Sequence, residues 1–256
     1  MITFRDHDRP LKDLDSVSLA SRLRQFFIDR YPVKQTEKLN DAIQVASYLH
    51  RTDVRRGGRG GMPNPPYIEH PLRVALRLVN LGVRDVDTFL AAILHDTVED
   101  HPFEFADFEG VEKTDDEAQA RINAFNFIGD KFGYITAAVV DSVSNPILPE
   151  GISKADKVKQ YQEHVEKVAL RSEQGRILKF SDFVDNAGSL HHHYKYNDPK
   201  ARYFIDRYMP LIPLYREAFD KNAVFYNPSY ARNRLRDVET QFSRFQVGLD
   251  IPLTVA

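Results

Sequence analysis

Apolar residues recur at spacings of three and four along much of the chain, which is the period of an amphipathic α-helix. Between Thr36 and Leu49, apolar side chains recur at 39, 42, 43 and 46, and Thr36 is a suitable N-cap. Alternating patterns typical of strands are nearly absent. Further helices are expected near 117–129, 131–143, 155–172, 176–190, 199–219 and 229–246. The pattern predicts an all-α fold of about ten helices with loop-like ends.

A loop and two helices are expected in the middle of the first half. The segment 55–66 contains four Gly and three Pro, a composition that predicts a loop. Pro71 suits the first turn of the helix that follows, and Gly82 suits its end. Either Asp85 or Asp87 can cap the next helix.

That next helix ends in a group of ionisable side chains. Its body, 89–94, is apolar on all sides, which predicts a buried central helix. Four ionisable residues follow: His95, Asp96, Glu99 and Asp100. If the helix continues, His95 shares one side of it with Glu99, and Asp96 shares another with Asp100. Three carboxylates facing the negative end of a helix dipole cost about 0.3–1 kcal/mol each. The arrangement therefore calls for a compensating charge, and a divalent cation is the obvious one.

A metal site needs more ligands than His95 and Asp96 provide. His70 lies at a loop-to-helix junction, and Asp182 lies in an apolar helix where burial is costly unless the carboxylate is paired. Histidine nitrogen and carboxylate oxygen suit Mn²⁺, Fe²⁺ or Zn²⁺. Alone, His70 is more often a helix-capping or core histidine and Asp182 more often a buried salt-bridge partner; together the four residues predict a metal centre. Glu69 is expected to be a solvated side chain rather than a partner that orients His70.

Composition narrows the classes of partner. The 256 residues include 35 basic and 37 acidic side chains, a formal charge of −2, which argues against general binding of nucleic acid. There is no cysteine, so disulfides, thiolate zinc sites and iron–sulfur clusters are excluded. The amino-terminal segment has no apolar core typical of a signal peptide, and no stretch is long and apolar enough for a membrane helix. We expect a cytoplasmic protein without membrane partners; its oligomeric state is not predicted.

These residues resemble the HD superfamily, whose pattern is H…HD…D. The runs PYIEHPLRVA, AAILHDTVED and ILKFSDFVDN are similar to the three signatures of the hydrolase domain of RelA/SpoT-type enzymes, and the segment from His50 to Arg56 resembles the basic motif before them. The similarity covers about 35–220, within one predicted domain spanning 1–256 whose last helix and tail occupy 221–256. It leaves no room for a synthetase domain, so the chain resembles the small alarmone hydrolases of the metazoan SpoT-like type.

The resemblance implies an all-helical enzyme with one Mn²⁺ per site, which removes pyrophosphate from the 3′ position of (p)ppGpp and releases GDP or GTP, or the adenine equivalents. It implies roles at matching positions. The metal ligands would be His70, His95, Asp96 and Asp182. The residues that position and activate the attacking water would be Glu99 and Asp100. The residues that bind the nucleotide substrate would be Arg55, Arg56, Lys179, Asn186 and Tyr203, with Tyr208 as a rival to Tyr203.

The sequence departs from the family pattern at several places. Arg56 stands where Lys is usual, His101 stands where Thr is common, and Phe183-Val-Asp185 replaces Arg-Leu-His. The loop 57–66 is also longer than usual. These changes leave open the choice between guanine and adenine. They also leave two alternatives: an HD phosphohydrolase acting on another nucleotide or a nicotinamide cofactor phosphate, and a non-catalytic nucleotide sensor.

Overall fold

The protein is described by a computed structural model for residues 11–55, 64–188, 190, 198–221 and 227–248. Helices account for the regular structure of these residues, which confirms the predicted all-α fold, and the extended pairing among them is an isolated bridge between Val54 and Pro66. The α-helices are α1 (Ser16–Ile28), α2 (Val33–Leu49), α3 (Glu69–Leu81), α4 (Val86–Leu94), α5 (Thr97–Asp100), α6 (Glu117–Phe132), α7 (Tyr134–Val143), α8 (Lys154–Arg171), α9 (Glu173–Ala187), α11 (Pro199–Tyr208), α12 (Leu211–Lys221) and α13 (Pro228–Gly248). Short 3₁₀ helices, η2 and η4, cover Leu11–Asp13 and Glu104–Asp107.

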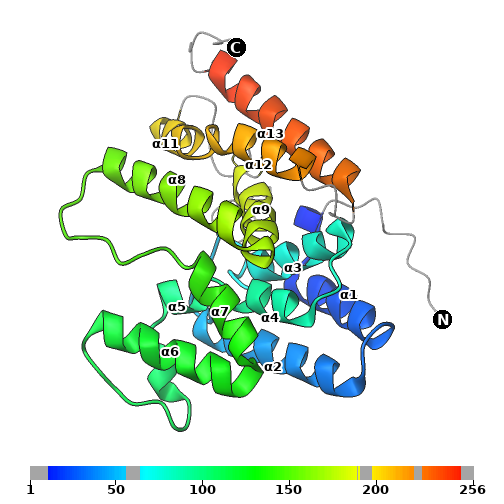
Figure 1. The fold of residues 1–256 in the computed structure, drawn as a ribbon, viewed down its shortest axis with the longest axis vertical. Coiled ribbons are helices and arrows are strands. Elements are labelled where there is room, and N and C mark those ends of the chain that lie inside the picture. Colours follow the sequence, from blue (N-terminus) through cyan, green and yellow to red (C-terminus); the bar gives the residue numbers. More distant parts are fainter. Residues whose placement is uncertain (1–10, 56–63, 189, 191–197, 222–226, 249–256) are drawn as a thin grey trace.

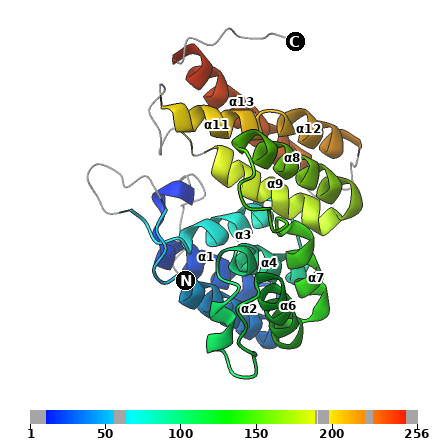
Figure 2. The same cartoon turned by 90° about the vertical axis from the view of Figure 1, so that its left-hand side faces the viewer.

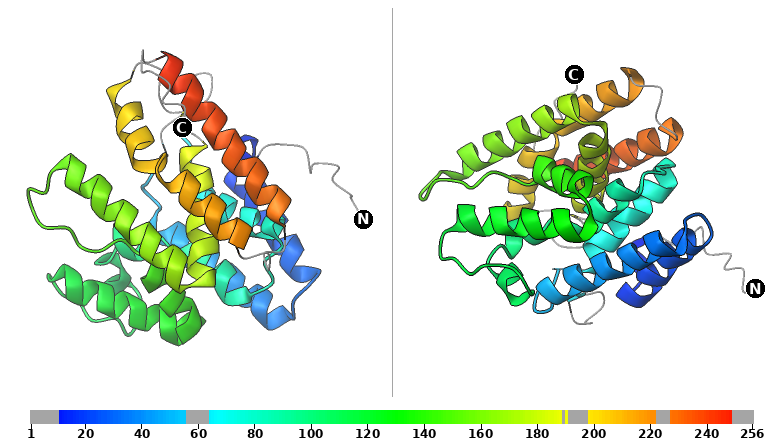
Figure 3. Two further views of the ribbon diagram at one scale, coloured as in Figure 1. Left: turned by 45° about the horizontal axis from the view of Figure 1, so that its top comes forward. Right: turned by 60° about the horizontal axis from the view of Figure 1, so that its bottom comes forward.

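Helix α9 connects two groups of helices. In Figures 1 and 2, α1 to α7 form the lower part of the molecule and α8 with α11 to α13 form the upper part. Helix α9 packs against α3, α4 and α7 below it and against α8, α11 and α13 above it. Figure 3 shows α12 and α13 side by side, and they pack on each other. Residues of α9 therefore meet those of α3 and α4 at the centre of the molecule.

The central helices are the most buried. From Thr88 to Leu94, α4 is buried throughout, as its uniformly apolar sequence predicts. Asp85, one of two predicted caps, accepts a hydrogen bond from the backbone N–H of Thr88 at 3.0 Å. Gly82 ends α3 with a φ of 84°, a left-handed conformation that glycine adopts without strain. Among the described helices, none combines the length and hydropathy that crossing a membrane requires.

Three helix boundaries differ from the predictions. The end regions were expected to be loop-like, but α1 is a helix capped by Asp15, whose side chain accepts from the N–H of Ser18 at 2.7 Å. Helix α2 begins at Val33 with Pro32 in the cap position, so Thr36 lies inside it and is not its cap. The predicted helix 199–219 is two helices, α11 and α12, which meet at Met209 and Pro210. Proline lacks the N–H that a continuous helix needs at that point.

A candidate metal centre between three helices

The turn between α4 and α5 carries four of the predicted site residues. Helix α4 ends at Leu94, His95 is its C-cap, and Asp96 precedes the single turn of α5 that contains Glu99 and Asp100. The expected continuous helix is therefore wrong, and so is the placement of three carboxylates in its last turn. The break turns His95 and Asp96 toward α3 and α9, whereas Glu99 and Asp100 belong to a separate short helix.

The side chains of His70, His95, Asp96 and Asp182 converge. The Nε2 atom of His70 lies 3.2 Å from Asp182 Oδ1 and 3.4 Å from Asp96 Oδ2. The Nε2 atom of His95 lies 3.1 Å from Asp96 Oδ2 and 3.9 Å from Asp182 Oδ1. Ligands bound at about 2.1 Å lie about 3.0–3.5 Å apart when they subtend 90–110° at the metal. These separations are close to those of donors around one cation.

The other ring nitrogen of each histidine is held by a hydrogen bond. His95 Nδ1 lies 2.9 Å from the carbonyl oxygen of Ala92, which can only accept, so Nδ1 donates. His70 Nδ1 lies 2.8 Å from Asp185 Oδ2, again an acceptor. In the neutral rings the lone pair is therefore on Nε2. Both Nε2 atoms are buried and have no hydrogen-bond partner among the described residues. Two inward lone pairs beside two carboxylates fit a divalent cation.

Asp185 contacts the candidate centre and was missed by sequence reasoning. It is fully buried, and besides His70 it receives Arg73 Nε at 3.0 Å, Arg77 Nη1 at 2.8 Å and Lys12 Nζ at 3.3 Å. Burial raises the pKa of this carboxyl, but the three cations outweigh it and hold the pKa well below its usual range. Asp185 is thus a carboxylate at neutral pH and fixes the ring of His70. The signal in the sequence was Arg73 and Arg77, one turn apart on a face that is otherwise apolar.

Glu69 does not lie in solvent as expected. Its side chain is buried and accepts from Arg73 Nη1 at 3.2 Å, which adds it to the ion cluster around Asp185. It contributes no hydrogen bond to His70 among the contacts of the described residues. The carboxylate that orients the histidine comes from α9, not from the neighbouring residue.

Glu99 and Asp100 lie in different surroundings. Glu99 is held by Asn145, whose backbone N–H donates to Oε1 at 2.8 Å and whose side-chain amide donates to Oε2 at 2.7 Å. The side chain of Asp100 reaches solvent, but protein packed around its carboxyl group and the charges of Asp96 and Glu99 raise its pKa to about 7. An adjacent divalent cation would lower that pKa, because it stabilises the carboxylate. Asn145, which follows α7, was not predicted as a site residue.

Two predicted substrate residues reach the edge of the centre. Arg55 Nη2 donates to Asn186 Oδ1, and Asn186 Nδ2 donates to Asp182 Oδ1. The guanidinium of Arg55 also lies 5.3 Å from the ring centroid of Tyr67, whose hydroxyl donates to Asp96 Oδ2 at 2.7 Å. Arg55 and Asn186 are therefore linked to the two carboxylates of the centre. Tyr67 was missed, although it lies three residues before His70.

The remaining predicted substrate residues are placed less uniformly. Lys179 is buried, with Nζ 3.9 Å from Asp182 Oδ2, so its charge faces a predicted ligand. Tyr203 is half-buried, whereas its rival Tyr208 is buried and packs in the core. Arg56 and most of the Gly/Pro-rich loop, 56–63, lie outside the described residues.

Comparison with known proteins gives a consistent set of relatives. No protein family model matches the chain. A guanosine-3′,5′-bis(diphosphate) 3′-pyrophosphohydrolase of Aquifex aeolicus is 31% identical over 186 residues, which are 70% of this chain and 21% of that enzyme. The Danio rerio enzyme of the same name, MESH1, is 29% identical over 156 residues, 60% of this chain and 70% of that protein. The chain thus spans about a fifth of the bacterial relative and most of the animal one.

The chain is similar to proteins named as ppGpp 3′-pyrophosphohydrolases. A solved structure described as a metazoan orthologue of SpoT that hydrolyses ppGpp has a TM-score of 0.50 with 21% identity, covering 86% of this chain and 98% of that one. At this identity the likeness concerns the fold, and it agrees with the all-α fold described above. The predicted resemblance to the RelA/SpoT hydrolases and their stand-alone animal counterpart is confirmed.

Proposed function

We propose that this protein removes pyrophosphate from the 3′ position of (p)ppGpp-type nucleotides in a metal-dependent reaction. The observation that carries the proposal is the convergence of two buried imidazole Nε2 atoms, each within 3.4 Å of a carboxylate oxygen of Asp96 or Asp182. Arg55 and Asn186 at the edge of that cluster supply groups suited to a phosphorylated nucleotide. The names of the relatives favour this substrate class over a nicotinamide cofactor phosphate.

The metal ligands in this proposal are His70, His95, Asp96 and Asp182. Two nitrogens and two carboxylate oxygens suit manganese, which we assign as the working metal, although zinc and iron accept the same donors. A cation bound there would supply Lewis acidity and lower the pKa of water toward about 7. The protein prepares for it by holding both histidines through Nδ1, so that no rotation of the rings is needed when the cation binds.

Glu99 and Asp100 would handle the nucleophile. Water attacks the phosphorus joined to the 3′ oxygen, the bond between that phosphorus and the 3′ oxygen breaks, and pyrophosphate leaves. Asp100, which a bound cation would keep ionised, would accept the proton of the attacking water and return one to the 3′ oxygen. Glu99, fixed by Asn145, would orient the water. Arg55 would neutralise phosphate oxygens by a forked pair of hydrogen bonds.

The test is incubation of the purified protein with Mn²⁺ and ppGpp, pppGpp, their adenine counterparts or NADPH, with products separated by chromatography. We expect the wild type to release pyrophosphate from the compounds that carry a 3′-pyrophosphate. Asp96→Ala should lose both this activity and metal binding. Release of orthophosphate from NADPH in place of pyrophosphate would refute the assigned substrate. Tight binding of the nucleotides without any turnover would instead indicate a sensor.

A further inference from the structure

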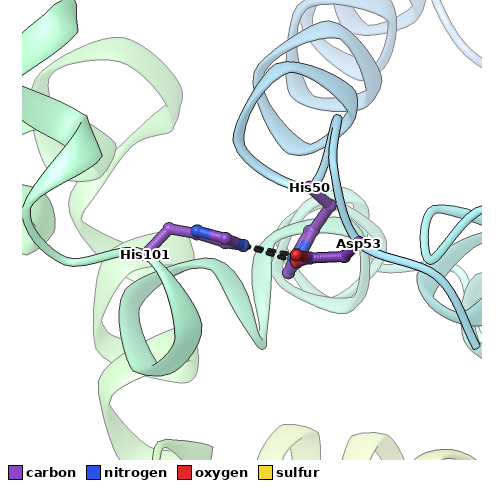
Figure 4. A group of neighbouring side chains, drawn as sticks. All are labelled: His50, Asp53 and His101. Atoms are coloured by element: carbon purple, nitrogen blue, oxygen red, sulfur yellow. Dashed lines mark hydrogen bonds and ion pairs between the residues drawn. The ribbon is translucent and has the colours of Figure 1, made fainter.

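A second group of histidine and aspartate side chains lies next to Tyr67, on whose ring the imidazole of His50 stacks with a centroid separation of 4.4 Å. His50 follows α2, Asp53 lies in the turn after it, and His101 follows α5, so the group joins two separate segments (Figure 4). His50 Nδ1 lies 2.8 Å from Asp53 Oδ2, His101 Nε2 lies 2.6 Å from the same oxygen, and the two nitrogens are 3.1 Å apart. Three donor atoms thus form a small triangle.

Hydrogen bonds hold this triangle only if one of its atoms serves two partners. If both nitrogens donate, two N–H groups 3.1 Å apart converge on one oxygen of Asp53. If one is unprotonated, the N–H of the other ring is shared between Asp53 Oδ2 and the free lone pair 3.1 Å away. Three ligands at about 2.1 Å are about 3.0 Å apart at 90° to one another and about 3.4 Å apart in a tetrahedron. The observed separations of 2.6 to 3.1 Å need only a small outward displacement to reach that geometry.

The surroundings leave both lone pairs available. His101 Nδ1 lies 3.3 Å from Glu104 Oε1, a carboxylate that can hold the proton on Nδ1 and leave the lone pair on Nε2. His50 Nε2 has no hydrogen-bond partner among the described residues, so no neighbour there imposes a tautomer. Both imidazoles are buried, whereas the side chain of Asp53 is 32% exposed. A cation on this triangle could therefore take water from the solvent side.

We propose that His50, Asp53 and His101 form a second metal site, separate from the hydrolase centre, for a borderline transition-metal cation such as Zn²⁺ or Co²⁺. Two imidazoles and one carboxylate favour these ions over Mg²⁺ and Ca²⁺, which prefer oxygen ligands. The site ties the segment leading to Arg55 to the residue after Asp100. Occupancy would hold the predicted substrate arginine and the acidic turn at a fixed separation.

The test is a titration of the metal-free full chain with Co²⁺, followed by visible absorption, with stoichiometry from calorimetry. We expect two equivalents in the wild type. His101→Gln should keep one equivalent and weaken the other by more than the roughly 10–100-fold that loss of an outer partner causes. Asp182→Asn should lose the equivalent bound at the hydrolase centre and keep the equivalent bound by His50, Asp53 and His101. The matched control is His164→Gln, which replaces a half-buried histidine on α8 that contacts the carbonyl oxygen of Val143. This variant should bind two equivalents of Co²⁺.

The outcomes separate this inference from the proposed function. If the wild type binds only one equivalent, and if His101→Gln keeps it while Asp182→Asn loses it, the proposal of a second site is refuted and the hydrolase centre stands. One equivalent with the opposite pattern would support the second site and refute the first. Because His101→Gln could unfold the turn, a second variant, Asp53→Asn, and melting curves without metal accompany it. Zn²⁺ should raise the melting temperature of Asp182→Asn; no rise would count against the second site.

Discussion

Replacing Asp185 by asparagine should weaken both the fold and the metal centre. The side chain is fully buried and is the shared partner of His70 Nδ1, Arg73, Arg77 and Lys12. Asparagine has nearly the same shape but no charge, and its amide nitrogen would meet guanidinium groups. The substitution therefore leaves buried cations facing one another without their carboxylate, and leaves the ring of His70 without a charged acceptor.

The two losses differ in size. Removing one partner of a buried ion pair typically costs about 3–5 kcal/mol of stability. For a chain of this length, 1 kcal/mol lowers the melting temperature by about 2–4 °C, so a decrease of about 6–20 °C is expected. Loss of an outer partner of a ligating histidine lowers metal affinity by about 10–100-fold. With a total stability of about 5–15 kcal/mol, Asp185→Asn should remain folded at low temperature.

Calorimetric titration with Mn²⁺ and thermal melts would measure both effects. Adding Arg77→Gln to Asp185→Asn removes one unpaired cation, so the double variant should regain part of the lost stability but none of the lost metal affinity. Asp220→Asn is the control: it breaks an exposed pair with Arg232 at 3.6 Å, should cost no more than about 1 kcal/mol, and should leave the metal affinity unchanged. Wild-type Mn²⁺ affinity in Asp185→Asn would refute the idea that Asp185 positions His70.

Three further predictions concern protons and positioning. Burial lowers the pKa of His95, but Asp96 and other acidic neighbours raise it to about 9. In the metal-free protein the proton on His95 therefore adds stability below pH 6.5, and this stability is lost as the pH rises to about 9. Because Mn²⁺ must displace this proton, the affinity for Mn²⁺ should rise up to about tenfold per pH unit between 7 and 9, as calorimetry in two buffers would show. Asn145→Ala should free Glu99 and lower kcat by about tenfold with metal affinity unchanged, measured by single turnover; an unaltered kcat would exclude the positioning role. Arg55→Ala should raise KM more than it lowers kcat if Arg55 binds the substrate, which steady-state kinetics would decide.

The features that the sequence predicts well are local ones. The apolar body of α4 and the periodic face of α3 are visible within one helix, and their burial follows from composition alone. The four predicted ligands stand out because each is a polar group at the end of, or inside, an apolar helix. The helical pattern of α1 was equally present, with Leu19, Leu23 and Phe27 buried on one face.

The breaks in helices were harder to predict. The apolar run of α4 continues smoothly into His95, and nothing in its period indicates an end. In the structure the hydroxyl of Thr97 donates to the carbonyl oxygen of Leu94 at 2.7 Å, a local bond that competes with helix continuation. The helix is interrupted at His95 and Asp96, which is why the expected placement of these residues with Glu99 in one continuous helix is wrong.

The ion cluster beside His70 shows how charged residues at separate buried positions of a sequence can have one structural cause. Asp185 departs from the residue type usual in this motif, and Arg73 and Arg77 interrupt an apolar helix face more than 100 positions away. Each is unfavourable alone, because an unpaired buried charge costs several kcal/mol. Together they form one buried network whose carboxylate still has an oxygen for His70. A charged residue at a core position is therefore best interpreted with the opposite charges at other core positions, since burial forces such residues to be neighbours.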